Sequence, residues 1–327
     1  MRFGILGAGN WGSIFGIMLN ELGHQVTLWE FNYRRAEVIS QTRDNSPFLV
    51  GRKIPEAITI TSELTTVLDG IDFLIIALPS QSVPDIIKSL PGGVPTLSLV
   101  KGMDVKRQLR ISEILGEKIK PDLIAVLSGP SIANEVKDRN PTSVVIASTN
   151  NNLASQLQSI LSSNYFRVYR SDDLIGAEFC GVYKNTIAIA CGICDGLGFG
   201  TNAKAALISR GLVEMKRFVV AAGGKAQTVF GLAGLGDIIT TSFSRHSRNR
   251  RLGEKIGQGM EVKEALREIV MVAEGYYSTP VLIKLGGKLG VELPIAQAVD
   301  SVLANLKKPT QVVEELMLRP LRSEGVQ

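Results

Sequence analysis

The chain has 327 residues, of which 45% are hydrophobic and 20% are charged, values that are ordinary for a globular protein with room for two domains. Its 36 Lys and Arg residues against 31 Asp and Glu residues give a net charge of only +5, and neither end carries a polybasic tail. These values exclude a long basic track for nucleic acid, so we expect no nucleic-acid partner.

Short β-branched apolar runs alternate with helical patterns through the first half of the chain, which is typical of repeated βα units and a mostly parallel sheet. Several runs are apolar without interruption, as expected for strands that are covered on both faces. The predicted fold class is therefore α/β, with an N-terminal doubly wound Rossmann domain. The predicted strands are Arg2–Leu6, Gln25–Glu30, Phe73–Leu78, Thr96–Val100, Leu123–Leu127, Ser143–Ala147 and Phe166–Tyr169.

The first strand leads directly into a glycine-rich turn. The apolar run of this strand is too short for a signal peptide, and no stretch of the chain is long enough to cross a membrane. We therefore expect a cytoplasmic protein with no membrane partner.

In the glycine-rich turn, Gly7, Gly9 and Gly12 form a G-x-G-x-x-G pattern just before the predicted helix Ile14–Leu22. Such glycines permit a tight turn and a close approach to a pyrophosphate, and the helix N-terminus supplies N–H groups. We therefore predict binding of NAD or NADP; a purely structural turn is the alternative.

Glu30 closes the second predicted strand, 18 residues after Gly12. An acidic side chain at this place can accept hydrogen bonds from the adenosine ribose, which favours NAD. Arg34 and Arg35 follow closely and could instead hold the 2′-phosphate of NADP. The spacing favours NAD slightly and leaves NADP open.

From about Leu174 onward the strand pattern stops and helical spacing takes over, so we predict an all-α second half. We place a dinucleotide-binding domain at residues 1–173 and a helical substrate-binding domain at residues 174–327. The predicted helices are Leu174–Ile193, Ala203–Ala222, Val262–Val270, Thr279–Leu289 and Ile295–Leu306.

Lys184 is the only charged residue between Glu178 and Asp195, in a segment that is otherwise apolar. Burial favours the neutral form of a lysine, which allows the amine to exchange a proton near neutral pH as a general acid or base. Neighbouring small residues permit close packing. We therefore predict a catalytic role for Lys184, against the alternative of a lysine that reaches the surface.

Cys191 and Cys194 form a C-x-x-C pair in the same segment, and Cys180 is the only other cysteine. A zinc site would need two further ligands, and a redox motif would open a helix after a strand. We expect small core residues, no disulfide framework and no metal.

A second polar cluster follows in the helical half. The glycine-rich run Gly231–Asp237 ends in a carboxylate, and Ser247, Arg248 and Asn249 come ten residues later, followed by two more arginines. Guanidinium forks, a hydroxyl and an amide suit a phosphate and a neighbouring hydroxyl. The alternative is a solvated basic turn before a helix that begins near Leu252.

These motifs, taken in order, resemble the bacterial-type NAD(P)-dependent glycerol-3-phosphate dehydrogenases over nearly the whole chain. The residues that carry the resemblance are Gly7–Gly12, Val100–Gly102, Ser128–Ser131, Val182–Asn185, Asp195–Ala203, Gly234–Asp237 and Ser247–Arg251.

The resemblance implies a C-terminal all-α domain like that of 6-phosphogluconate dehydrogenase, a homodimer, and a supply of glycerol phosphate to phospholipid synthesis. It implies that Lys184 exchanges the proton at the C2 oxygen, beside Lys101 and Asp237. The implied binders of the phosphorylated substrate are Lys101, Gly129, Ser131, Lys184, Asp237, Ser247, Arg248 and Asn249. The residues at cofactor positions, glycines included, are Gly7, Gly9, Asn10, Trp11, Gly12, Glu30, Phe31, Lys101, Ala133, Arg248, Val272 and Glu274.

One departure from the family pattern concerns the cofactor. Relatives often have a basic residue just after the second strand, where this chain has Glu30 and Phe31, which argues against a strict NADPH preference. Two rival functions stay open: a dehydrogenase of a hydroxy acid or a 2-ketoacid such as ketopantoate, and a nucleotide sensor without catalysis.

Overall fold

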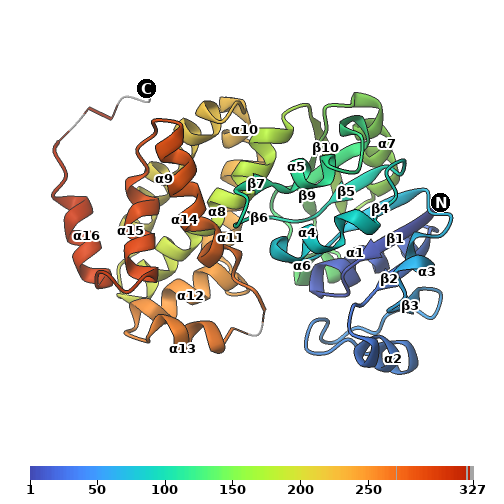
Figure 1. The fold of residues 1–327 in the computed structure, drawn as a ribbon. Helices are drawn as coiled ribbons and strands as arrows, with labels where there is room; N and C mark the ends of the chain where they lie inside the picture. The colour runs from blue at the N-terminus through green and yellow to red at the C-terminus, as the bar shows by residue number, and fades with distance from the viewer. Residues whose placement is uncertain (270, 322, 325–327) are drawn as a thin grey trace. The chain divides into compact units, whose positions relative to one another are not determined.

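The computed structural model describes residues 1–269, 271–321 and 323–324. The chain divides into two compact units (Figure 1). The first unit comprises Met1–Val100 and Leu109–Leu174. The second comprises Lys101–Gln108 and the chain from Ile175 onward.

An eight-stranded sheet forms the centre of the first unit, in the order β10-β9-β8-β5-β4-β1-β2-β3. Neighbouring strands are parallel except β8 and β9, which confirms the predicted mostly parallel sheet. The seven predicted strands are present, and the additional β3 was not predicted. The strands are β1 (Arg2–Leu6), β2 (Gln25–Trp29), β3 (Thr59–Thr61), β4 (Phe73–Ile76), β5 (Thr96–Ser98), β8 (Ile124–Ser128), β9 (Thr142–Ala147) and β10 (Phe166–Ser171). Two short strands, β6 (Met103–Asp104) and β7 (Leu109–Arg110), lie outside this sheet.

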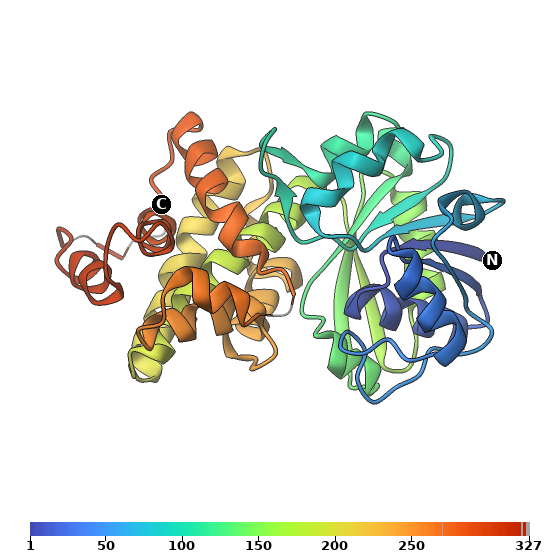
Figure 2. The same cartoon turned by 60° about the horizontal axis from the view of Figure 1, so that its bottom comes forward.

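Helices cover both faces of the sheet, as a doubly wound fold requires (Figure 2). One face packs on α1, α6 and α7, and the other on α3, α4 and α5. The helices are α1 (Asn10–Glu21), α2 (Tyr33–Thr42), α3 (Leu64–Leu68), α4 (Val83–Ile86), α5 (Ile111–Gly116), α6 (Ala133–Lys137) and α7 (Asn151–Leu161), with the short turns η1 (Ser80–Ser82), η2 (Ile87–Ser89) and η3 (Pro121–Leu123).

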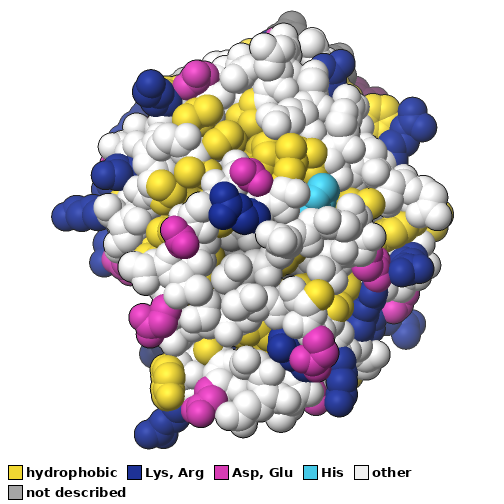
Figure 3. All heavy atoms as spheres, turned by 90° about the vertical axis from the view of Figure 1, so that its right-hand side faces the viewer, with side chains coloured by type: hydrophobic (Ala, Val, Ile, Leu, Met, Phe, Trp, Pro, Cys, Tyr) yellow, Lys and Arg dark blue, Asp and Glu magenta, His cyan; other side chains and the backbone are white. Residues whose placement is uncertain are grey.

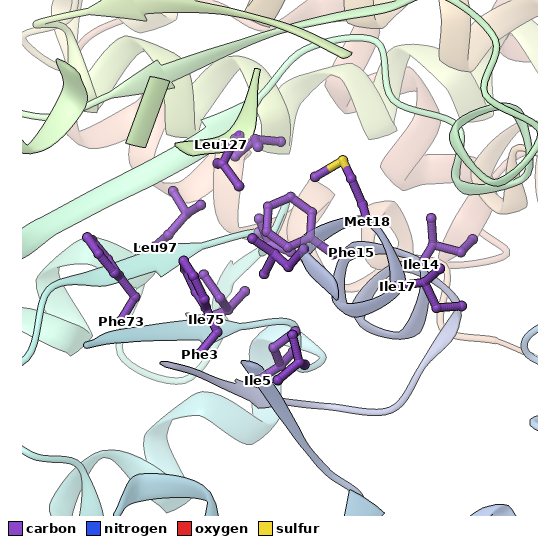
Figure 4. Close-up of a cluster of buried hydrophobic side chains, with 14 of the residues drawn as sticks. Phe3, Ile5, Ile14, Phe15, Ile17, Met18, Phe73, Ile75, Leu97 and Leu127 are labelled. Carbon is purple, nitrogen blue, oxygen red and sulfur yellow. The ribbon is translucent and has the colours of Figure 1, made fainter. Parts of the chain in front are cut away.

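Strand β4 is apolar throughout because its successive side chains enter different cores. Ile75 lies in the core under α1, whereas its neighbours Leu74 and Ile76 lie in the core under α4 and α5. Figure 4 shows Phe15 and Met18 of α1 directed towards the strands of the sheet. This packing fixes the start of α1, and with it the glycine-rich turn.

The second unit is helical in its described part from Ile175 onward, as predicted. Helices α10, α11 and α16 were not predicted. The predicted segment Val262–Val270 is helical as α13 up to Arg267, and Val270 lies outside the described residues. The helices are α8 (Leu174–Gly196), α9 (Thr201–Ala221), α10 (Ala226–Phe230), the π-helical turn η4 (Leu232–Gly236), α11 (Asp237–Phe243), α12 (Arg248–Gly257), α13 (Val262–Arg267), α14 (Glu274–Lys288), α15 (Pro294–Leu303) and α16 (Pro309–Met317).

Among the helices of the described residues, none is long and apolar enough to cross a membrane. On the face shown in Figure 3, Lys and Arg side chains are interspersed with Asp and Glu rather than gathered into one field.

Helix α8 is the central helix of the second unit, and its residues 176–194 are all buried. A buried carboxylate ties it to two other helices. The Tyr183 hydroxyl donates to Glu214 Oε1 at 2.6 Å, and the backbone N–H groups of Ile295 and Ala296 donate to the same carboxylate at 2.9 Å each. Glu214 of α9 therefore caps α15 and anchors α8.

Glycines allow α8 and α12 to cross with their backbones in contact. A Cβ atom on Gly192 would lie 1.9 Å from the Arg250 carbonyl oxygen, and one on Gly253 would lie 2.0 Å from the Ile189 carbonyl oxygen. Gly196 and Gly257 repeat this pattern one turn further along. Such close approach permits Cα–H···O contacts and leaves no room for a side chain.

We expect Gly253→Ala to lower the free energy of unfolding by about 1–3 kcal/mol, because the new methyl group must push the two helices apart. Urea unfolding followed by circular dichroism measures the change. Gly287→Ala is the matched control, since a Cβ there would meet nothing within 4 Å. Equal stability of both variants would contradict the close crossing.

Candidate active site

The glycine-rich turn of the first unit has three glycines with three different surroundings. Gly7 has φ +113°, and a Cβ on it would lie 2.6 Å from the Ala77 carbonyl oxygen. A Cβ on Gly12 would lie 2.0 Å from the Gly7 carbonyl oxygen, whereas Gly9 faces open space. Gly7 and Gly12 are therefore needed for the turn and the helix packing, and Gly9 leaves the backbone open to a ligand.

The N-terminus of α1 offers donors at this turn. Gly9 is the N-cap residue and no side chain caps the helix. Among the described residues, Asn10 Oδ1 and Trp11 Nε1 are buried polar atoms without a hydrogen-bond partner. Unpaired polar groups beside an uncapped helix N-terminus fit the pyrophosphate of a dinucleotide.

Glu30, expected to meet the ribose, is occupied within the protein. Its side chain is 3% exposed, accepts from Asn32 N at 3.1 Å and pairs with Arg35 Nη1 at 3.0 Å. The next residue, Phe31, is 73% exposed.

A buried charge cluster joins three predicted residues in the second unit. Lys184 Nζ of α8 donates to Asp237 Oδ1 at 2.6 Å, and Lys101 Nζ donates to Asp237 Oδ2 at 2.9 Å. Lys184 and Asp237 are buried, and Lys101 is partly exposed. Two ammonium groups therefore share one carboxylate.

This arrangement tunes both titratable groups. Burial lowers the pKa of Lys184 from 10.5 to about 7; Asp237 opposes the shift, while the charge of Lys101 adds to it. Burial alone would raise the pKa of Asp237, but Lys101 and Lys184 outweigh it and hold that pKa below its usual value. Near neutral pH, Lys184 can therefore both give and accept a proton, and Asp237 stays ionised.

Two neighbours of the cluster were not singled out from the sequence. Thr241 Oγ1 accepts from Lys184 Nζ at 3.0 Å, and Asn185 Nδ2 donates to the Lys101 carbonyl oxygen at 3.0 Å. Thr241 follows Asp237 by four residues on α11, so helical spacing was an available signal. Asn185 adjoins Lys184, but its contact with Lys101 is invisible in the sequence.

The predicted phosphate-binding residues lie at the start of α12. Ser247 caps this helix by accepting from Arg250 N at 3.2 Å, and Arg248 is its exposed first residue. Asn249 is buried, donates to Asn185 Oδ1 at 2.8 Å and accepts from Gly275 N at 3.0 Å. Arg248 thus combines a guanidinium with a helix N-terminus, both favourable for an anion.

The neighbouring arginine has a different partner. Arg250 Nε donates to Asp195 Oδ2 at 2.6 Å and pairs with Glu254 at 3.1 Å. Lys204 pairs with the same aspartate. Arg250 therefore serves the structure rather than a ligand.

The remaining predicted residues occupy chain segments between or at the ends of elements. In the first unit, Gly129 has φ +112°, its carbonyl accepts from Ser131 Oγ at 3.0 Å, and Ala133 begins α6. In the second unit, Val272 is 38% exposed and Glu274 begins α14.

The three cysteines are buried free thiols, as expected for core residues. Burial raises the pKa of Cys191 to about 12, so this thiol is unreactive near neutral pH. Among the described residues no group of His, Cys, Asp and Glu is arranged to hold a metal ion.

Comparisons with known proteins cover both units. The family description "NAD-dependent glycerol-3-phosphate dehydrogenase N-terminus" matches residues 2–154, and its C-terminal counterpart matches residues 173–314. A glycerol-3-phosphate dehydrogenase [NAD(P)+] of Geobacter sp. (strain M21) is 41% identical over 99% of each chain. One from Prosthecochloris aestuarii is 38% identical over 98% of each chain.

Solved structures give the same result. The glycerol-3-phosphate dehydrogenase of Coxiella burnetii superposes with a TM-score of 0.92 at 37% identity, covering 97% of this chain and 99% of that one. A ketopantoate reductase of Ralstonia eutropha, at 15% identity and a TM-score of 0.59 over 96% of this chain and all of that one, shares the fold alone.

We expect Asp237→Asn to lower the free energy of unfolding by about 3–5 kcal/mol at pH 6, because Lys101 and Lys184 lose the carboxylate that they share. A lysine whose pKa is lower in the folded state gains stability for that state as pH rises. Loss of Asp237 lowers the pKa of Lys184 further, so the deficit relative to the unmodified protein should be smaller at pH 9. Urea unfolding at the two pH values measures it.

Asp300→Asn is the control for that comparison, because Asp300 lies outside the cluster and burial raises its pKa. It should be at least as stable as the unmodified protein at both pH values, because the substitution removes a charge that burial disfavours. A pH-independent deficit in Asp237→Asn would contradict the proposed coupling of Asp237 to Lys184.

Proposed function

Because this chain belongs to the NAD-dependent glycerol-3-phosphate dehydrogenase family, we propose that it reduces dihydroxyacetone phosphate to sn-glycerol 3-phosphate with NAD(P)H. The observation that carries this proposal is the buried Lys184 amine, whose pKa of about 7 suits proton transfer to a ketone oxygen. The proposal extends to a cytoplasmic homodimer that supplies phospholipid synthesis.

Each half of the chain has its own part in this proposal. Residues 1–173 hold the dinucleotide through the Gly7–Gly12 turn and the N-terminus of α1. Residues 174–327 supply the proton and most of the substrate contacts, and Lys101, Gly129 and Ser131 supply the others. Lys101, Ala133, Arg248, Val272 and Glu274 complete the proposed cofactor contacts.

The bound nicotinamide supplies a hydride for C2 of the substrate. An ammonium has three donors. Within the described part of the chain, Lys184 donates two hydrogen bonds, to Asp237 and to Thr241. The third is available for the C2 oxygen, and the charges of Lys101 and Lys184 stabilise that oxygen as negative charge develops.

Asp237 has a positioning role in this scheme. It stays ionised, so it does not compete with Lys184 as a proton source, and its two oxygens hold both amines. After Lys184 gives up its proton, the pair Lys101–Asp237 remains neutral and the Lys184 amine can recover a proton from water.

The substrate phosphate is assigned to the start of α12. Arg248 supplies an exposed guanidinium there, with Ser247 and Asn249 beside it. Gly129 and Ser131 are assigned to the rest of the substrate. A phosphate dianion uses more donors than a carboxylate, which favours this substrate over a 2-ketoacid.

The direct test is oxidation of NADH and of NADPH, followed at 340 nm, with dihydroxyacetone phosphate, unphosphorylated dihydroxyacetone and ketopantoate compared side by side. Only the phosphorylated ketone should be turned over efficiently. Preferred turnover of ketopantoate would establish the rival dehydrogenase, and constant absorbance with every ketone would favour a sensor.

We expect Lys184→Ala to reduce kcat about 10²–10⁴-fold while nucleotide binding persists, because general acid catalysis is lost. In the unmodified enzyme, reduction should slow as the pH rises through about 7, where Lys184 loses its proton. The variant should lack this pH dependence.

Lys204→Ala is the matched control, because Lys204 is another buried lysine that pairs with Asp195 outside the cluster. It should retain kcat within a few-fold and the same pH profile. Turnover of Lys184→Ala like that of the unmodified enzyme would remove the role assigned to Lys184.

A further inference from the structure

Arg35 lies where the first unit would meet the adenosine ribose, but other groups hold its guanidinium. It belongs to the first turn of α2, just after β2. Nη1 is 3.0 Å from Glu30 Oε2, and Nη2 donates to Asn45 Oδ1 at 2.6 Å and to the Ala8 carbonyl oxygen at 3.3 Å. The guanidinium carbon lies 4.3 Å from the centre of the Phe48 ring. Arg35 is thus bound to the strand end, the glycine-rich turn and the segment after α2.

The partners of Arg35 are themselves fixed. Asn45 is 1% exposed, and its Nδ2 donates to the Ala8 carbonyl oxygen and to Ser13 Oγ, both at 2.8 Å. This directs the Asn45 amide oxygen at Arg35. Glu30 is held by Asn32 N and is closed to solvent. Groups of the protein itself therefore fix the position of the Arg35 guanidinium.

NADP differs from NAD by a 2′-phosphate on the adenosine ribose. Dinucleotide-binding folds select NADP with an arginine near this strand end, whose charge and forked donors meet the phosphate. Here Glu30 neutralises the nearest arginine and occupies part of its fork. Phe31, two residues after the end of β2, is exposed and its side chain has no donor to offer.

Resting on the dinucleotide binding proposed above, we propose that this protein selects NADH over NADPH, and that Glu30 sets the preference by retaining Arg35. Glu30 is thus a positioning residue that acts through Arg35. Arg34 is exposed, and a solvated charge at that place contributes little to selection.

Calorimetric titration with NADH and with NADPH, without any ketone, tests this on four proteins: the unmodified chain, Glu30→Gln, the double variant Glu30→Gln/Arg35→Gln, and the control Arg34→Gln. The unmodified chain should bind NADH at least about tenfold more tightly than NADPH, the scale of one hydrogen bond to a charged group. Glu30→Gln keeps the side-chain shape but releases Arg35, so its affinity for NADPH should rise about tenfold.

The double variant separates two ways in which Glu30 can act. If Glu30 withholds Arg35, removing Arg35 as well abolishes the gain in NADPH affinity. If Glu30 only repels the 2′-phosphate, the gain persists in the double variant, and the proposal is wrong. Arg34→Gln should leave the ratio of the two dissociation constants unchanged within about twofold, since exposed charges contribute little.

Equal or tighter binding of NADPH by the unmodified chain overturns the proposal, even if Glu30→Gln fails to fold. This failure differs from failure of the proposed function. An enzyme that reduces dihydroxyacetone phosphate mainly with NADPH keeps the function and loses this inference. A protein that binds NADH selectively but reduces no ketone keeps this inference and loses the proposed function.

Discussion

The structure of the second unit depends on one carboxylate, Asp237, placed between two ammonium groups. Burying Lys184 inside an apolar helix is unfavourable, and a fully matched ion pair would merely cancel that cost and keep the lysine charged at all physiological pH values. Sharing Asp237 with Lys101 compensates only in part. Burial lowers the pKa of Lys184 to about 7, Asp237 opposes this shift, and the charge of Lys101 adds to it. An oxygen that becomes negative beside these two cations would be stabilised.

Close packing of the helices around this cluster keeps Lys184, Lys101 and Asp237 in fixed positions. The crossing of α8 and α12 brings backbone against backbone, so the start of α12 has little freedom relative to Lys184. Buried amides add a directional link: Asn249 contacts Asn185, and Asn185 contacts the Lys101 carbonyl oxygen. The charged groups of the cluster must be positioned to within a few tenths of an ångström. The helix crossing and the buried amides fix these positions, although none of these residues carries a charge.

Much of this could be predicted from the sequence, because the relevant signals are local. Strand and helix periodicity predicted the sheet and the helical half, and Lys184 was conspicuous as the only charge in a long apolar run. Strand β3 has three residues, too few for an alternation of apolar and polar side chains to be recognised in the sequence. The pairing of Lys184 with Asp237 spans 53 residues, and that of Lys101 with Asp237 spans 136, so no spacing rule reveals them. The same limit applied to Arg35, which the sequence offered as a phosphate ligand and the fold pairs with Glu30.

Two buried carboxylates in this chain, Glu30 and Asp237, differ in the number of cations that they contact. Glu30 and Arg35 are matched one to one and each is bonded to a further group, so their charges offset each other, and we propose that the pair disfavours a 2′-phosphate. Asp237 faces two cations, and burial together with the charge of Lys101 lowers the pKa of Lys184 to about 7. Similar ion pairs thus carry the proposed selectivity in one unit and the proposed proton transfer in the other, and they differ in how many cations each carboxylate contacts.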